Sequence, residues 1–425
     1  MTEDFLHFIW KYGLFERNEM ITDTGEQIQV IGLGEHNSDA GPDFLNTRIK
    51  IGNTTWAGNV EIHLRSSDWV NHRHQYDKAY DNVILHVVYR HNQPLQRKTG
   101  EVIPTVELRF NTSLYENYCL LLAQKNGLPC KDKIRQVDPL IIDLWLISLV
   151  VERLQQKTQY ITGLLDQYIN NWEEVFYISL ARSFGFGLNA VPFEMMAKSI
   201  SLSCLARHRN NPKQLEAMLM GQAGFLDEAV LYADYYTDMR SEYMHLKNKY
   251  SLKPIEKHVW KFLRLRPVNF PTIRIAQFAK LLERSEGLFS QVLACQEISE
   301  LRQFFDIRAS DFWDTHYTFE TSSPRTVKRF GNDSFNIIII NTVVPFLFLY
   351  GKMTAQEELK NRALEWLNKI PAEKNRIIER WAQSAFALSN AFYSQGVIQL
   401  ANGYCNRKRC LACSIGSHII TTGIG

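Results

Sequence analysis

Residues 82–89 read Asn-Val-Ile-Leu-His-Val-Val-Tyr, a nearly continuous run of apolar, mostly β-branched side chains. Such a run is typical of a strand that is buried on both faces near the centre of a sheet. Residues 101–110 predict a further strand after it. Toward the amino terminus, residues 49–51 and 60–63 alternate apolar and polar side chains, as half-buried strands do.

The turn Gly52-Asn53 separates the two alternating segments and predicts a hairpin between them. Residues 4–15 carry apolar side chains at helical spacing, which predicts a short helix ahead of the strands. We therefore expect residues 1–112 to form a mixed, β-rich domain.

From residue 113 onward the apolar period becomes helical. Asp138 and Asn171 are of the residue types that cap helix starts, and Thr272 is a third candidate. The segments with this period are residues 139–156, 172–184, 192–207, 227–250, 272–284, 335–349 and 355–370. The sequence therefore predicts an α+β protein in which the β-rich domain packs on a larger, all-α domain over residues 113–425.

The composition of the 425-residue chain is ordinary, with 45% hydrophobic and 22% charged residues, which excludes a disordered or collagen-like protein. The acidic start, Met1 to Asp4, is unlike the basic start of a signal peptide. Residues 334–351 are the longest apolar stretch and fall short of the roughly 20 residues that span a bilayer. We expect a cytoplasmic protein with reduced cysteines and no membrane partner.

Two acidic residues and a histidine flank the predicted hairpin. Asp43 precedes the first alternating segment, and Glu61 and His63 lie two residues apart on the second. Residues two apart on a strand face the same way, so Glu61 and His63 project together, and a hairpin would bring Asp43 near them. Carboxylates are the oxygen ligands that Mg²⁺ or Mn²⁺ prefers. A metal held there would activate a water molecule for hydrolysis.

This arrangement, Pro-Asp followed by Glu-x-His within residues 41–63, resembles the PD-(D/E)XK phosphodiesterase superfamily, which includes many nucleases. The resemblance implies that Asp43 and Glu61 bind the metal. His63 stands where the superfamily has a lysine that orients the attacking water, and a histidine lacks that residue's fixed positive charge. The alternative is a capped turn before the strand and a solvated strand face.

Histidines are concentrated in the same region of the chain. His72 and His74 form a His-x-His pair, and Asp77 follows them. Together with His63, these side chains would suit a zinc or manganese ion. The alternative is that His72 and His74 lie on a solvated helix or loop. His86 lies within the apolar strand, where a histidine is more often a hydrogen-bonded core residue.

Cys405, Cys410 and Cys413 form a Cys-x4-Cys-x2-Cys motif. Three of the seven cysteines within nine residues favour a metal over disulfides in a reducing compartment. Thiolates suit Zn²⁺ or an iron–sulfur cluster. His418 would complete a local zinc site, whereas Cys130 would join distant parts of the chain. The second arrangement resembles the iron–sulfur nucleases of the superfamily named above, although their cysteine spacing differs.

Six basic residues of the second domain are candidates for contacts with nucleic-acid phosphates. They are Arg264, Arg266, Arg274, Arg407, Lys408 and Arg409. The first three surround a proline-rich turn with Phe270, which could stack a base; the alternative is that they pair locally and lock the turn. The last three lie between the cysteines, where a metal-bound loop would present them and a solvated loop would explain them equally well.

Six stretches along the chain carry a further resemblance. They are Gly-Pro-Asp-Phe at 41–44, Gly-Asn-Val-Glu-Ile-His at 58–63, Ser-Ser-Asp-Trp at 66–69, Val-Ile-Leu-His-Val-Val at 83–88, Leu-Arg-Pro-Val-Asn-Phe-Pro at 265–271 and a Tyr-Cys…Arg-Cys-Leu-Ala-Cys-Ser-Ile-Gly end at 404–416. Together they resemble the bacterial domain of unknown function family 2851, nearly end to end. The resemblance implies a bacterial origin and one integrated architecture, but it supplies no activity.

These residues favour a metal-dependent phosphodiesterase or nuclease acting on nucleic acid, with Asp43, Glu61 and His63 at its centre. Two alternatives stay open. One is a binding module for nucleic acid or protein, in which the cysteine motif is a structural staple. The other is a zinc hydrolase built on His72 and His74.

Overall fold

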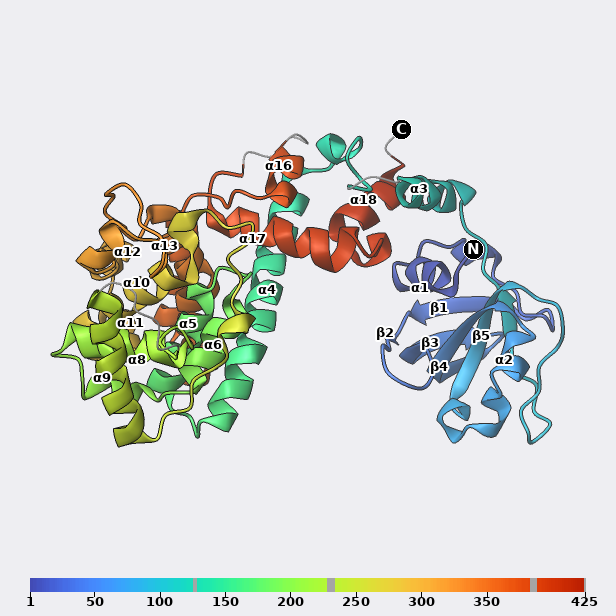
Figure 1. Ribbon diagram of the computed structural model, residues 1–425. Helices are drawn as coiled ribbons and strands as arrows, with labels where there is room; N and C mark the ends of the chain where they lie inside the picture. The colour runs from blue at the N-terminus through green and yellow to red at the C-terminus, as the bar shows by residue number, and fades with distance from the viewer. Residues whose placement is uncertain (125–127, 228–233, 383–387, 424–425) are drawn as a thin grey trace. The chain divides into compact units, whose positions relative to one another are not determined.

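A computed structural model shows the predicted α+β fold (Figure 1). A mixed sheet occupies the amino-terminal part of the chain, between residues 28 and 107, and most of the remainder is helical. The structure describes residues 1–124, 128–227, 234–382 and 388–423.

The chain forms two compact units that do not divide at the predicted boundary between residues 112 and 113. The sheet unit comprises Met1–Leu146, Arg380–Phe386 and Leu400–Gly425, and the helical unit comprises Ile147–Glu379 and Ala387–Gln399. The carboxyl-terminal helix α18 (Ser414–Thr422) belongs to the sheet unit because it packs on α3 (Thr112–Ala123), where the Asn117 side chain donates to the Ile420 carbonyl. Helical periodicity does not show which core a helix joins, so the boundary was misplaced.

The sheet has the strand order β1-β3-β4-β5-β6, and β2 pairs with β3 beside β1. The strands are β1 Ile28–Gly32, β2 Glu35–His36, β3 Phe44–Ile51, β4 Thr54–Arg65, β5 Val83–Arg90 and β6 Thr105–Glu107. Pairing is antiparallel from β1 through β4 and parallel from β4 to β6. The strand predicted over residues 101–110 is therefore confirmed only in its short centre.

The predicted hairpin joins β3 to β4. Ile51 pairs with Thr54 next to the turn, and Phe44 pairs with Val60 at the other end of the ladder. Gly52 adopts a φ of 55°, a left-handed conformation that suits glycine in a tight turn. The register shifts by one residue between Thr47 and Phe44, and the pairing of Phe44 with Val60 then sets Asp43 next to Glu61.

The parallel step from β4 to β5 requires a crossover, which here consists of α2 (Asp68–Asn71) followed by two 3₁₀ turns, His74–Tyr76 and Lys78–Tyr80. A small core under the crossover holds it on the sheet. Its buried members are Trp69, Tyr80, Val83, Leu95 and Ile103. The strand β5 is buried along most of its length, as its β-branched sequence predicts.

Helix α1 (Glu3–Lys11) buries an aromatic and aliphatic face in the sheet unit and contacts β4. It ends before the predicted limit at residue 15. The long helix α4 (Pro139–Gln167) begins in the sheet unit and continues into the helical unit, so it extends well beyond the predicted residue 156. The Asp138 side chain accepts from the Leu140 amide, which confirms the predicted cap.

The helical unit has one continuous core. After α4, its helices are α5 Trp172–Phe184, α6 Ala190–Lys198, α7 Leu202–Ala206, α8 Pro212–Gln222, α9 Asp234–Tyr250, α10 Pro271–Arg284, α11 Leu288–Ala294, α12 Ile298–Phe304, α13 Asn332–Ile338, α14 Val344–Met353, α15 Glu357–Lys369, α16 Arg376–Ala382, which continues into the sheet unit, and α17 Ala391–Gln399. The helix predicted over residues 192–207 divides into α6 and α7, and part of the segment predicted over 227–250 lies outside the described residues. Asn171 caps α5 as predicted, whereas the Thr272 hydroxyl donates to the Tyr317 carbonyl instead of capping α10.

Residues Asn332–Met353 form one helical stretch that is long and apolar enough to cross a membrane. In the structure, 78% of its apolar window is buried inside the protein. This is the environment of a core helix, and the stretch includes a π-helical segment at Ile339–Val343.

Gly58 lies where β4 approaches the start of β5. A Cβ atom at this position would lie 2.4 Å from the Ile84 side chain and 2.7 Å from the Asn82 carbonyl oxygen. We expect Gly58→Ala to lower the free energy of unfolding by about 1–3 kcal/mol, because the two strands would have to separate. A lower melting temperature in thermal unfolding would show it.

Gly163 provides a matched control, because it lies within α4 and no atom would meet a Cβ there. Gly163→Ala should raise stability by about 0.5–1 kcal/mol through its higher helix propensity. An unchanged melting temperature in Gly58→Ala would contradict the close approach of β4 and β5.

Candidate metal centre

Asp43 and Glu61 lie next to each other at the end of the β3–β4 ladder. The Asp43 amide donates to Glu61 Oε2 at 3.2 Å, and the Ile62 amide donates to Asp43 Oδ2 at 2.9 Å. The structure therefore brings together the two carboxylates that the sequence singles out. Burial raises the pKa of Glu61, and the nearby Asp43 charge adds to this effect while contacts with His74 oppose it.

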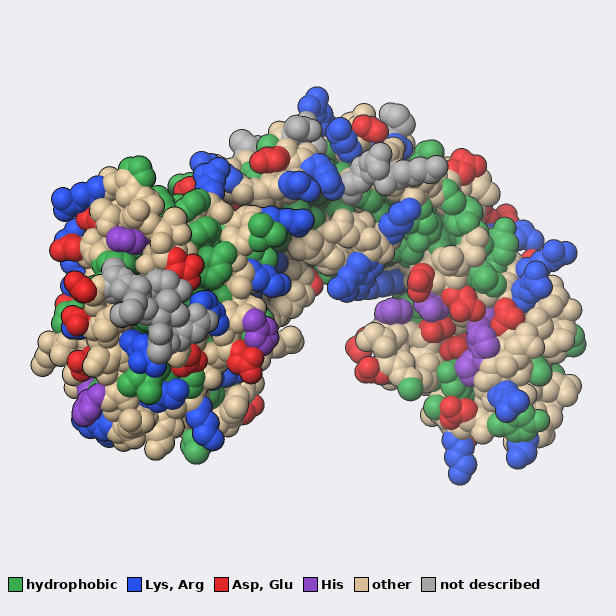
Figure 2. Space-filling model, in the orientation of Figure 1, with side chains coloured by type: hydrophobic (Ala, Val, Ile, Leu, Met, Phe, Trp, Pro, Cys, Tyr) green, Lys and Arg blue, Asp and Glu red, His purple; other side chains and the backbone are tan. Residues whose placement is uncertain are grey.

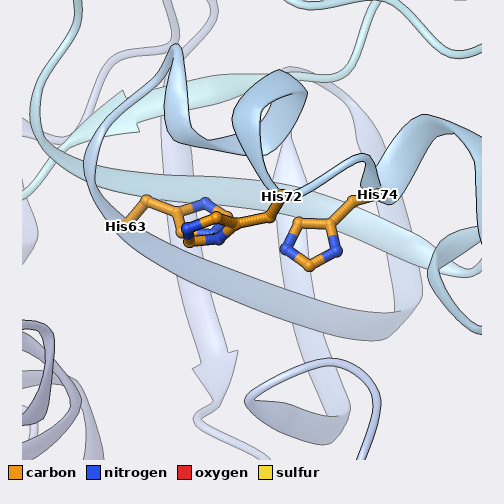
Figure 3. A group of neighbouring side chains, drawn as sticks. All are labelled: His63, His72 and His74. Carbon is orange, nitrogen blue, oxygen red and sulfur yellow. The ribbon is translucent and has the colours of Figure 1, made fainter.

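Three imidazoles converge beside Glu61, from His63 on β4, His72 at the end of α2 and His74 in the following turn. Figure 3 shows His74 next to the His63 and His72 rings, which overlap in this view. One nitrogen from each ring lies within 4.8 Å of the other two. His63 Nε2 lies 3.1 Å from His72 Nδ1. Glu61 Oε1 lies 3.4 Å from His63 Nε2 and 3.3 Å from His74 Nε2.

The local backbone explains how two histidines of one short segment reach the same point. Arg73, between them, has a φ of 65°, so the chain turns sharply after α2. The His74 ring then stacks on Tyr80 with 3.9 Å between the ring centroids. Since Tyr80 belongs to the small core under the crossover, this contact fixes the His74 ring in place.

His86, on the neighbouring strand β5, orients the His63 ring. His86 Nε2 lies 2.8 Å from His63 Nδ1, a hydrogen-bond distance, which leaves His63 Nε2 directed at Glu61 and His72. Burial, reinforced by the charges of His74 and His72, lowers the pKa of His63 to about 3. A neutral ring with one nitrogen held by a neighbour and the other free is the form in which histidine binds metals.

The spacing of these atoms suits a tetrahedral metal ion. Zinc–nitrogen bonds of about 2.0–2.1 Å place neighbouring ligand atoms about 3.3 Å apart in a tetrahedron. The separations of three neighbouring pairs, His63–His72, Glu61–His74 and Glu61–His63, are 3.1, 3.3 and 3.4 Å, and the three imidazole nitrogens lie within 4.8 Å of one another. In addition, the Nε2 atom of the half-buried His74 faces Glu61 Oε1 and not solvent. The donor set therefore fits a metal, and exposed His72 leaves one side of it open to solvent.

Asp77, predicted as a further ligand, does not belong to this group. Its side chain is exposed and accepts a hydrogen bond from the Ala79 amide at 2.9 Å. Asp77 thus caps the second 3₁₀ turn of the crossover. An aspartate two residues before an amide commonly forms such a cap, and this local use removes it from the metal site.

His7 and His36 belong to the surroundings of the centre and were not singled out in the sequence. His7 Nε2 lies 3.2 Å from Asp43 Oδ2. Burial opposes protonation of His7, but the Asp43 carboxylate outweighs it and raises the pKa of His7. The sequence did contain a signal for His7, because it is a polar residue within the apolar face of α1.

A cavity of about 370 Å³ adjoins this pair. It is lined by Asp4, His7, Phe8, Lys11, Tyr12, His36, Tyr118, Arg407, Lys408, Arg409, Leu411 and Ala412. Its walls therefore come from α1, β2, α3 and the loop between the cysteines, all in the sheet unit. Figure 2 shows histidine and acidic side chains gathered on one face of this unit. Arg407, Lys408 and Arg409 line this cavity, and their contact with nucleic-acid phosphates stays a prediction.

Arg274 is the clearest error among the predicted phosphate contacts. Its side chain is buried, donates to Gln277, Asn269 and Ser334, and lies over the Phe186 ring. It therefore locks the turn before α10, the alternative considered from the sequence. Arg264 and Arg266 are exposed in the helical unit, and their role in binding stays a prediction.

All four cysteines of the predicted staple lie in the sheet unit. Cys130, Cys410 and Cys413 are each 7% exposed, and all seven cysteines of the chain are free thiols. No three of the described thiols come within 4.8 Å of one another, as the imidazoles do. Among the described residues, the histidines and not the cysteines are thus close enough together to bind a single metal ion.

The geometry defines an α+β protein with a candidate metal centre at the end of a hairpin in its mixed sheet. Residues 3–376 match the family model described as "Protein of unknown function (DUF2851)", and the chain belongs to this family. No curated protein and no solved structure matches the chain. The family description states no activity, so the site itself must indicate the function.

The arrangement predicts one Zn²⁺ or Mn²⁺ ion per chain, measurable by elemental analysis after dialysis against the metal. The double substitution His72→Ala/His74→Ala should abolish binding because it removes two of the three imidazoles. His86→Ala should weaken affinity by about 10–100-fold, since it removes only the support of His63.

Two controls separate this site from others in the chain. Substituting Cys410 by Ser or the exposed His258 by Ala should leave binding to the histidine centre unchanged. Full metal content in the double histidine variant would refute the assignment.

Proposed function

We propose that this protein is a metal-dependent phosphodiesterase that cleaves nucleic acid. The observation that carries the proposal is the convergence of three imidazoles and Glu61 directly beside the Asp43–His7 pair. Neither feature alone indicates hydrolysis. Together they provide ligands for a metal and, in His7, a group that can transfer a proton close to that metal.

The ligand chemistry favours zinc or manganese over magnesium. Imidazole nitrogen suits zinc and related transition metals, whereas Mg²⁺ prefers oxygen ligands and water. The metal would supply a bound water molecule whose pKa is lowered toward about 7. In this proposal, the nuclease centre on Asp43, Glu61 and His63 and the hydrolase centre on His72 and His74 are one site.

The chain's own residues then have distinct roles. His63, His72 and His74 would hold the ion together with Glu61, which lies 3.3–3.4 Å from two of their nitrogens, and His86 orients His63. Asp43 is fixed by the Ile62 amide, and its carboxylate raises the pKa of His7 and so favours the protonated imidazole. His7 can therefore donate a proton to the oxygen that leaves when the phosphodiester bond breaks.

The adjoining cavity supports an anionic substrate. Lys11, Arg407, Lys408 and Arg409 line it together with His7, and Asp4 is the acidic side chain among its lining residues. Such a wall suits phosphate groups of a nucleic-acid strand more than neutral or cationic substrates.

Cleavage of a labelled oligonucleotide in the presence of Mn²⁺ or Zn²⁺ tests the proposal. Glu61→Gln should abolish cleavage, because the neutral amide is a poor metal ligand of similar shape. His7→Ala should lower kcat by about 10²–10⁴-fold while metal binding persists, as expected for loss of a general acid.

Glu35→Gln is the matched control, since Glu35 is exposed on β2 in the same unit. It should cleave like the wild type. Undiminished cleavage by Glu61→Gln, with an intact fold by circular dichroism, would rule out the proposed centre.

A nucleic-acid-binding module without catalysis is the second candidate, and the cationic cavity is the observation in its favour. Under either function, Arg407→Ala should weaken binding of single-stranded oligonucleotides and reduce the slope of log K against log salt by about 0.7–1, because one phosphate contact is lost. Fluorescence anisotropy at several salt concentrations measures both quantities.

Lys98→Ala serves as the control, because Lys98 is exposed in the sheet unit and does not line the cavity. Equal affinity losses in the two variants would show that the cavity is not the binding surface. Binding without turnover under any metal would select the second candidate.

A further inference from the structure

The helical unit contains a cavity of about 560 Å³ that takes no part in the proposed hydrolysis. Lys157 from α4, Ser179 from α5 and Asn341 from the π-helical segment line three of its sides. Its volume falls within the range of about 300–1,000 Å³ that is usual for small-molecule sites. All of its walls belong to one compact unit, so the cavity is a property of the helical unit itself.

A buried hydroxyl on the wall of this cavity lacks a partner. Ser179 is 6% exposed, and its Oγ atom has no hydrogen-bond partner among the described residues. A buried polar group left in this state costs about 1–3 kcal/mol. The hydroxyl of Ser183, one turn further along α5, is instead bonded to the Thr342 hydroxyl. Ser179 therefore presents an unused donor and acceptor that a polar ligand would satisfy.

Lys157 places a cation on the same wall. Its ammonium donates to the Ile340 carbonyl at 3.1 Å and to Gln395 Oε1 at 2.7 Å, which fixes its position. Burial lowers the pKa of Lys157 to about 7, and the charge of Arg153 adds to this effect while that of Glu373 opposes it. A negative charge in the cavity would favour the protonated ammonium.

Arg182 adds a second cation one turn from Ser179 on α5. Its Nη1 donates to Glu194, whose other carboxylate oxygen lies 2.6 Å from the Lys198 ammonium. One carboxylate thus serves two cations and cannot balance both. A guanidinium has five N–H donors, so the bond to Glu194 leaves others for a ligand. Among the described residues that line the cavity none is acidic, and its polar end therefore suits an anion.

The rest of the wall is largely apolar. Ile161, Phe186 and Phe346 line it, and Ile161 and Phe346 are buried members of the core of the helical unit. Apolar surface of this kind favours a hydrocarbon group over water. The cavity therefore combines a cationic end with an apolar end.

We propose that this cavity binds a small amphipathic anion, in which a carboxylate or phosphate head is attached to a hydrocarbon body. The head would bond to Ser179 and Arg182 beside the Lys157 ammonium, and the body would lie against Phe186 and Phe346. This assignment goes beyond the proposed hydrolysis, because none of these residues belongs to the sheet unit that holds the histidine centre.

Titration calorimetry of the full-length protein with octanoate, octyl phosphate and octanol tests the proposal. The wild type should bind at least one of the two anions at one site per chain, and the tighter anion identifies the preferred head. Octanol has the same hydrocarbon chain without the charge, so its affinity should be lower by about tenfold or more.

Two variants test the polar end of the cavity. Ser179→Ala should weaken binding of the preferred anion by about tenfold, the loss expected when one hydrogen bond to a charged group is removed. Its melting temperature should not fall, because the hydroxyl removed has no partner in the folded protein. Lys157→Met should also weaken binding by about tenfold or more. Lys352→Met is the matched control, since Lys352 is exposed on α14 and does not line the cavity, and it should bind like the wild type.

Three results would overturn the assignment. They are the absence of saturable binding of either anion, equal affinities for octanol and the anions, and undiminished binding by Ser179→Ala. Should Lys157→Met fail to fold, Ser179→Ala alone decides the question. Metal content and oligonucleotide cleavage should be unchanged in Ser179→Ala, which separates failure of this proposal from failure of the proposed hydrolase.

Discussion

The register between β3 and β4 is the constraint on which the candidate centre depends. It sets Asp43 opposite Glu61 and points Glu61 and His63 to one face of the sheet. A slip of one residue would turn both side chains to the opposite face and separate them from His72 and His74. The turn at Gly52 sets the pairing from Ile51 to Thr47, and the irregularity between Thr47 and Phe44 shifts it by one residue before Asp43 meets Glu61.

Strand β4 serves a second purpose through its parallel pairing with β5. His86 pairs with Glu61 across this boundary and reaches His63 from the neighbouring strand. The parallel step also requires a crossover, and that crossover carries His72 and His74. The sheet topology thus supplies the supporting histidine and the two remaining imidazoles of the centre in one connected segment.

The sheet unit gathers the candidate chemistry from both ends of the chain. Residues of α1 and β2 form part of the cationic cavity, and the cysteine loop forms the rest. Since the helical unit occupies the intervening sequence, the carboxyl-terminal segment must return to the sheet unit, where α18 packs on α3. Contacts at Leu122 and Trp145 secure that return.

Local sequence alone determined several features of this protein's fold and candidate site. The apolar run at residues 82–89 is a buried strand, Gly52-Asn53 is a hairpin turn, and the pattern Pro-Asp with Glu-x-His does bring Asp43 to Glu61. These features follow from periodicity and turn chemistry, which act over a few residues. The same kind of reasoning failed for Asp77 and Arg274, because each satisfies neighbours that a charge pattern does not reveal. Only the tertiary structure decided that His7 meets Asp43 and that α18 packs on α3. Such meetings depend on strand register, on the left-handed turn at Arg73 and on which core each terminal helix joins, and none of these is a property of a single segment.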